Sequence, residues 1–215
     1  MFSFQTIFDN LPVLIGAARY TLLISVLGCA QGLLVGALVC AGALSRRVWL
    51  RRAAALYVSF FRGVPLLIQL LVAFYLLPVI GINVPALVAA VLTVGLCAAA
   101  YLSEVLRGAL NAIPRGQAEA AAAIGMAPRD LWLRILLPQA LKIGLPAIIN
   151  ELILLVKASS LVTVVGIVEI TRMSQSIASA TYRPLEIYLA AAFLYLAINL
   201  VIAQAGRLLE RRLAY

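Results

Sequence analysis

The chain has 215 residues, of which 65% are hydrophobic and only 12% are charged, and its mean hydropathy is +1.08. A soluble domain carries about a quarter charged residues, so this composition indicates an integral membrane protein. The formal net charge is +9, but the basic residues lie in short clusters between apolar runs, which excludes a nucleic-acid-binding surface. The absence of histidine excludes zinc–histidine sites and histidine general bases, and the three cysteines have no metal-ligand spacing.

Five segments are apolar and long enough to cross a bilayer, which requires about 20 residues. They cover roughly 18–44, 60–80, 85–106, 138–168 and 184–206. The sequence therefore predicts an all-α integral membrane protein with five transmembrane helices in one domain, residues 1–215.

Two of these spans carry residues that disturb a helix. Arg62 beside Gly63 and Pro65 predicts a break where the second span begins, at its cytoplasmic entrance. The fourth span is interrupted by polar and helix-breaking residues, and we expect it to be bent or partly broken there. These residues are Gly144, Pro146, Asn150, Glu151 and Lys157.

The distribution of basic residues predicts the orientation. Three flank the spans on one side (Arg19, Arg172 and Arg183), whereas thirteen lie on the other side. Because basic residues accumulate in cytoplasmic loops, the N-terminus is expected outside, in the periplasm, and the C-terminus in the cytoplasm. The thirteen are Arg46, Arg47, Arg51, Arg52, Arg62, Arg107, Arg115, Arg129, Arg134, Lys142, Arg207, Arg211 and Arg212.

The cytoplasmic loop 108–137 carries the most informative pattern. Residues 117–124 are rich in alanine and predict a helix with little side-chain bulk. Gly125 suits a helix end that needs a positive φ, and Pro128 suits the first turn of the next helix. Pro138 is expected to end or kink that second helix. The pattern predicts a helix–turn–helix against which another protein can pack closely.

The spacing within this loop resembles the EAA signature of ABC importer permeases. The matching residues are Glu119, Ala120, Ala121, Gly125, Ile135, Leu137 and Pro138. Three further segments resemble the polar amino acid branch, which includes histidine, arginine, glutamine and opine importers. They read FFRGVPLLIQ at 60–69, AYLSEVLRG at 100–108, and NE through KASSL at 150–161.

The resemblance implies a fold, partners and a location. It implies the transmembrane domain of an ABC type I importer in the bacterial inner membrane, paired with a second permease that is identical or homologous. Two ABC ATPases would dock on the EAA loops and carry ATP and magnesium, and an external binding protein would deliver the substrate. This chain contains no G-x-x-x-x-G-K-[ST] phosphate loop, so we expect no cofactor on it and no enzymatic activity.

Polar residues within the spans are candidates for the substrate path, because ionisable groups in hydrocarbon are costly. Several structural explanations remain open for them: Glu104 can pair with Arg107, Lys157 can snorkel, and the serines can bond their own helix carbonyls. Glu104 and Glu151 favour a basic amino acid or an opine as substrate. The candidates are Arg62, Gln69, Glu104, Asn150, Glu151, Lys157, Ser159 and Ser160.

Two observations limit this interpretation. Many relatives have an acidic residue after the lysine of the fourth span, where this chain has Ala158, so substrate charge does not carry over directly. The alternative function is an ATP-independent secondary amino acid transporter or channel. We find no internal repeat that favours it, and it would leave the EAA spacing unexplained.

Overall fold

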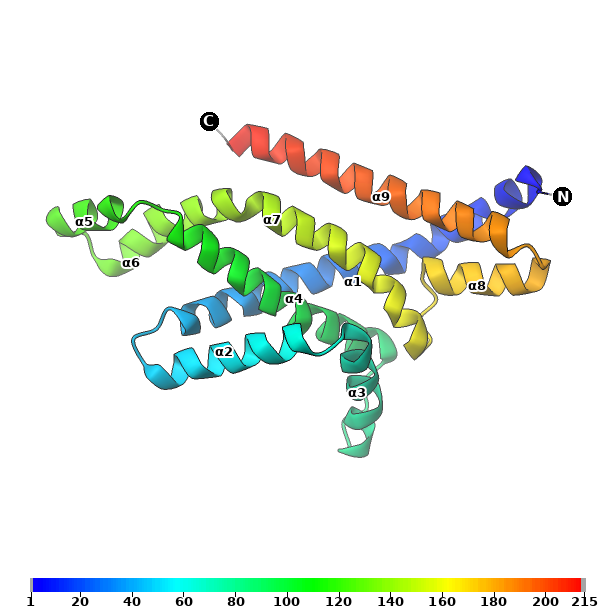
Figure 1. Ribbon diagram of the computed structural model, residues 1–215, viewed down its shortest axis with the longest axis horizontal. Helices are drawn as coiled ribbons and strands as arrows, with labels where there is room; N and C mark the ends of the chain where they lie inside the picture. The colour runs from blue at the N-terminus through cyan, green and yellow to red at the C-terminus, as the bar shows by residue number, and fades with distance from the viewer. Residues whose placement is uncertain (1, 214–215) are drawn as a thin grey trace.

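The computed structural model describes residues 2–213, and that part of the chain folds entirely into helices and short connections. Figure 1 shows an elongated bundle in which α1, α7 and α9 follow the long axis, with the two termini at opposite ends. The helices are α1 (Phe4–Ala43), α2 (Val48–Gly63), α3 (Leu66–Val79), α4 (Ala86–Asn111), α5 (Arg115–Ala123), α6 (Pro128–Asp130), α7 (Leu137–Ala158), α8 (Ile170–Thr181) and α9 (Pro184–Leu213). A π-helical segment, η1 (Leu131–Leu136), precedes α7, and a 3₁₀ segment, η2 (Ser159–Val165), follows it.

Four helical segments of the described chain are long and apolar enough to cross a membrane: α1, α4, the run Pro128–Val165, and α9. The helices α2 and α3 meet the same criterion only as a pair, and they are bent by 103° relative to each other. The expected all-α class is confirmed, whereas a count of five spans requires α2 and α3 to be taken together.

The core of the bundle is the contact between α1 and α4. Gly28, Gly32 and Gly36 recur every four residues and form one stripe of α1. A Cβ atom on these glycines would come within 2.9 Å of Val94 Cγ1, 2.8 Å of Ala98 Cβ and 3.0 Å of the Ala99 carbonyl oxygen, respectively. Small residues at this spacing let two helix backbones approach closely, which is how helices associate where lipid removes the hydrophobic driving force.

The second predicted span is not a single helix, because α2 ends at Gly63 and the chain turns sharply before α3. Pro65 has no N–H group, so the Phe61 carbonyl loses its helical donor. The Gln69 side chain replaces that donor: its Nε2 donates to the carbonyls of Phe61 at 3.0 Å and Val64 at 2.8 Å. Gln69 therefore stabilises the break.

Arg62 lies near the C-terminal end of α2. It stands at the end of α2 far from the α1–α2 turn at Leu44–Arg47, and its guanidinium lies 5.3 Å from the centre of the Tyr101 ring. The predicted break is present at the end of the sixteen-residue helix α2, and its place at the cytoplasmic entrance stays a prediction.

The fourth span is also irregular at a different place from the one expected. Helix α7 continues through Gly144, Pro146 and Asn150, and the α-helix ends only at Ala158. The chain then tightens into η2, where the Ser159 and Ser160 hydroxyls each donate at 2.8 Å to a carbonyl three residues earlier. Gly166, with φ of +82°, ends this segment.

A network around Glu169 holds α8 against the bundle. The Glu169 side chain is fully buried and accepts the N–H groups of Thr171 and Arg172 at 2.9 and 2.8 Å, which caps α8. It also accepts a hydrogen bond of 2.7 Å from the Tyr195 hydroxyl on α9. These contacts join the end of the fourth span to the fifth.

The close packing of α1 on α4 gives the first prediction. Gly32→Val should lower the free energy of unfolding by about 1–3 kcal/mol, because its Cβ meets Ala98 and Leu102. Gly16→Val is the matched control on the same helix, since a Cβ there has no atom within 4 Å. Thermal unfolding in detergent measures both variants, and equal melting temperatures would contradict the assignment of this contact as the core.

Candidate functional site

The loop between α4 and α7 forms the predicted helix–turn–helix. Helix α5 ends at Ala123, and Gly125 adopts a φ of +71°. The Gly125 N–H donates to the Ala122 carbonyl at 3.0 Å and the Met126 N–H to the Ala121 carbonyl at 2.9 Å. This is the hydrogen-bond pattern of a glycine-terminated helix, and Pro128 then begins α6.

The surface of α5 has little side-chain bulk. Ala121 is buried against the protein, whereas Glu119 and Ala120 are exposed. The Ile124 side chain, directly before the glycine turn, is 77% exposed. Sequence reasoning did not single out Ile124, although an isoleucine beside a turn glycine in an otherwise small helix was a usable signal. The helix presents an apolar tip beside a flat alanine surface and one carboxylate.

Two glutamine side chains fasten α5 to the long α7. Gln117 Nε2 donates to Gln139 Oε1 at 2.9 Å, and Gln139 Nε2 donates back to Gln117 Oε1 at 2.5 Å. Gln139 also donates to the Ile135 carbonyl at 2.9 Å. This contact was not anticipated, because the two residues lie 22 positions apart in sequence.

The remaining three residues of the EAA signature follow the turn in the sequence. Ile135 belongs to η1, and Leu137 and Pro138 begin α7. The helix does not end at Pro138, contrary to one of the two outcomes expected for it. Just before Pro138 the backbone hydrogen bonds span five residues instead of four, and the Leu137 N–H donates to the Trp132 carbonyl. These residues form the connection from the turn into the fourth span.

The polar residues of the fourth span do not gather at one place. Glu151 is only 8% exposed and lies inside the subunit, whereas Asn150 and Lys157 lie on the exposed side of α7. This separation follows from helical periodicity, which places Glu151 and Lys157 about 240° apart. The Ser159 and Ser160 hydroxyls already donate to carbonyls of their own helix.

Glu104 has a partner within its own helix. The Arg107 guanidinium donates to both carboxylate oxygens of Glu104, at 3.1 and 2.5 Å. The negative charge of Glu104, which the sequence suggested as a partner for a cationic substrate, is therefore compensated by Arg107.

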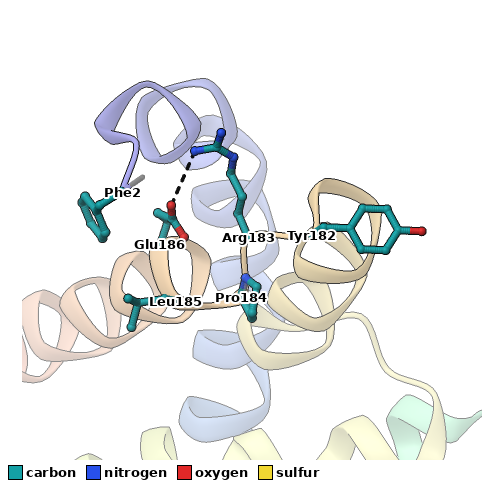
Figure 2. A pocket seen from close by; sticks show the side chains of 6 residues that line it. All are labelled: Phe2, Tyr182, Arg183, Pro184, Leu185 and Glu186. Atoms are coloured by element: carbon teal, nitrogen blue, oxygen red, sulfur yellow. Dashed lines mark ion pairs between the residues drawn. The ribbon is translucent and has the colours of Figure 1, made fainter.

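The end of the molecule opposite α5 carries exposed aromatic and apolar side chains. Figure 2 shows Phe2, Tyr182 and Leu185 around a shallow pocket, with Arg183 paired to Glu186 at 3.5 Å. Tyr182 is 90% exposed and has a φ of 55°, which is unusual for a residue other than glycine.

A family model described as "Binding-protein-dependent transport system inner membrane component" matches residues 32–215, which include the α5–α6 turn and every predicted site residue. This chain belongs to that family. Among its relatives, the arginine transport system permease protein ArtQ of Bacillus subtilis is 36% identical, with 98% of this chain and 96% of the relative covered. The glutamine transport system permease protein GlnP of Escherichia coli is also 36% identical, with 99% and 98% covered.

A solved structure shares the whole arrangement of helices. The "Crystal structure of an amino acid ABC transporter with histidines" matches with a TM-score of 0.90 at 33% identity and covers 99% of both chains. The fold of this family member is therefore that of an ABC type I transporter transmembrane domain, and the resemblance drawn from the EAA spacing is confirmed.

Proposed function

We propose that this chain is the permease subunit of an ABC importer for polar amino acids. Its single transmembrane domain forms one half of the translocation pathway. The observation that carries the proposal is the exposed α5–Gly125–α6 turn at one end of the bundle. It supports docking of an ATPase, and two ABC ATPases, a second permease and an external binding protein complete the importer. ATP and magnesium belong to the ATPases in this scheme.

The construction of the turn suits it to transmit force. The alanine surface of α5 admits another backbone closely, while Ile124 supplies an apolar anchor. The Gln117–Gln139 contact fastens α5 to the start of α7. Closure of the ATPase pair would therefore displace α7 and the α4 helix packed against it, which is a rigid-body change between two states.

The charges support an orientation in which α5 faces the cytoplasm of a bacterial inner membrane. The α1–α2 turn, α5, α6 and the C-terminal end of α9 lie at one end of the bundle in Figure 1, and α8 and the N-terminus lie at the other. The basic residues of the α1–α2 turn, α5, α6 and the end of α9 therefore lie at the α5 end, and basic residues accumulate on the cytoplasmic side of a membrane protein. Arg62 stands at the other end of α2 from the α1–α2 turn, outside these segments.

The substrate class rests on the relatives and on the polar residues of the spans. Importers of arginine and of glutamine have permeases with similar identity to this chain. A basic amino acid or an opine remains our proposal from the acidic residues of the spans. Because Glu104 is paired with Arg107, Glu151 is the remaining carboxylate that supports a cationic substrate.

Two substitutions in the turn test coupling. Gly125→Val should disrupt the turn, because a β-branched residue disfavours positive φ, and Glu119→Lys should reverse the charge at the docking surface. Each should abolish ATP-driven amino acid uptake by the reconstituted complex while the subunit still inserts in the membrane. Gly108→Val is the control, since this glycine lies in α4 with open space around it. Normal uptake by both turn variants would remove the coupling assignment.

Reagent access tests the orientation. Single cysteines replacing Ser179 or Tyr182 should react in whole cells with an impermeant thiol reagent added outside, because both positions are exposed at the end that carries α8. Cysteines replacing Arg47 or Arg129 should react only after the membrane is opened. The reverse pattern would invert the proposed topology.

A further inference from the structure

A polar groove runs between α2 and α4, on a face that the coupling turn does not use. It consists of two adjacent cavities of about 360 and 500 Å³, which share Val58 and Ser59 in their linings. On α2 the lining residues recur every three or four positions and so form one stripe; on α4 they recur every three. The polar ones are Arg51, Ser59 and Arg62 on α2, and Tyr101, Glu104 and Arg107 on α4.

The groove runs along α4 from its α5 end toward its middle. Tyr101 lies ten residues before Asn111, the last residue of α4, which corresponds to about 15 Å along the helix. With the α5 end of α4 at the surface of a hydrocarbon core about 30 Å thick, as the proposed orientation requires, Tyr101 and the Arg62 guanidinium beside it stand near mid-depth. Arg107 lies one turn from the end of α4 and marks the mouth of the groove.

An arginine at this depth is costly unless it faces a polar cavity or binds a partner. The Arg62 guanidinium makes no hydrogen bond or ion pair with any residue in 2–213, and its contact there is the face of Tyr101. The Ser59 hydroxyl likewise makes no hydrogen bond within that part of the chain. Glu104, by contrast, is neutralised by Arg107. Arg62 attracts Glu104 only at a distance, so the deep part of the groove has guanidinium donors without a hydrogen-bond acceptor, and their planar arrangement matches a carboxylate.

We propose that this groove is the inward half of the substrate path, and that Arg62 binds the α-carboxylate of the amino acid at mid-depth. Tyr101 holds the guanidinium through a cation–π contact, and Ser59 donates to the same carboxylate. Arg51 then offers a further positive charge toward the cytoplasmic mouth. This inference rests on the proposed function and adds the group of the substrate that the path recognises.

The same chemistry would suit the phosphate of an anionic lipid. Headgroups lie at the bilayer surface, about 15 Å from mid-depth, so a lipid would engage Arg51 before Arg62. The amino acid carboxylate is the occupant that the depth of Arg62 favours.

Transport by the complete reconstituted complex tests the role of Arg62. The probes are radiolabelled L-arginine and L-glutamine, with ATP hydrolysis measured in parallel. Arg62→Gln should lower uptake about tenfold or more, the size expected for a lost charged hydrogen bond. Arg62→Lys should restore part of the uptake because it retains the charge. Arg52→Gln changes an exposed arginine of α2 that does not line the groove, and it should have no effect.

These outcomes separate the inference from the proposed function. Normal uptake by Arg62→Gln would overturn the inference and leave the importer assignment intact. Failure of the unmodified complex to take up either amino acid, or any other in a labelled panel, would contradict both.

A second measurement does not depend on changing Arg62. Ser59→Cys is placed in a chain whose Cys29, Cys40 and Cys97 are replaced by serine, and two methanethiosulfonate reagents are compared, one anionic and one cationic. After correction for their rates with a free thiol, the anionic reagent should react several-fold faster, and the transported amino acid should slow it. No reaction with either reagent, equal corrected rates, or protection by anionic lipid vesicles but not by the amino acid would overturn the proposal.

Discussion

The hydrocarbon core of a bilayer offers no hydrogen-bond partners, and this constraint determines where the chain can interrupt a helix. At the α2–α3 break, Pro65 withholds a donor from the Phe61 carbonyl and the Gln69 side chain supplies one. In η2, serine hydroxyls donate to carbonyls of the tightening helix. The helix therefore breaks or tightens where the chain carries its own replacement donors.

Between these interruptions, close packing and hydrogen bonds join the helices of the subunit to one another. The glycine stripe of α1 brings its backbone against α4, so the two helices cannot slide without steric overlap. Glu169 joins the end of the fourth span to α8 and to Tyr195 of α9, and the two glutamines join α5 to α7. A displacement of α5 by an ATPase would therefore reach the opposite end of the bundle, and the walls of the groove between α2 and α4 would move with it.

Features that depend on local chemistry could be predicted from the sequence, and those that depend on distant partners could not. The Gly125 turn is encoded within ten residues, and apolar runs reveal most spans. The 103° angle between α2 and α3 depends on packing against α4, which a sequence pattern does not contain. Packing likewise kept α7 helical through Pro146 and Asn150, where local propensity favoured a break. The roles of Gln139 and Glu169 depend on contacts with residues more than twenty positions away in sequence, whereas Gln69 donates to carbonyls within eight positions of it.

The most direct test of the account is a pair of distances in the complete reconstituted complex. Spin labels at Arg129 on α6 and Ser179 on α8 report the separation between the two ends of one subunit. A second pair, at Ser179 and at the external end of the partner permease, reports motion between subunits. The account predicts that ATP binding changes the second distance and leaves the first unchanged. A change within the subunit as large as that between subunits would contradict rigid-body coupling through α5.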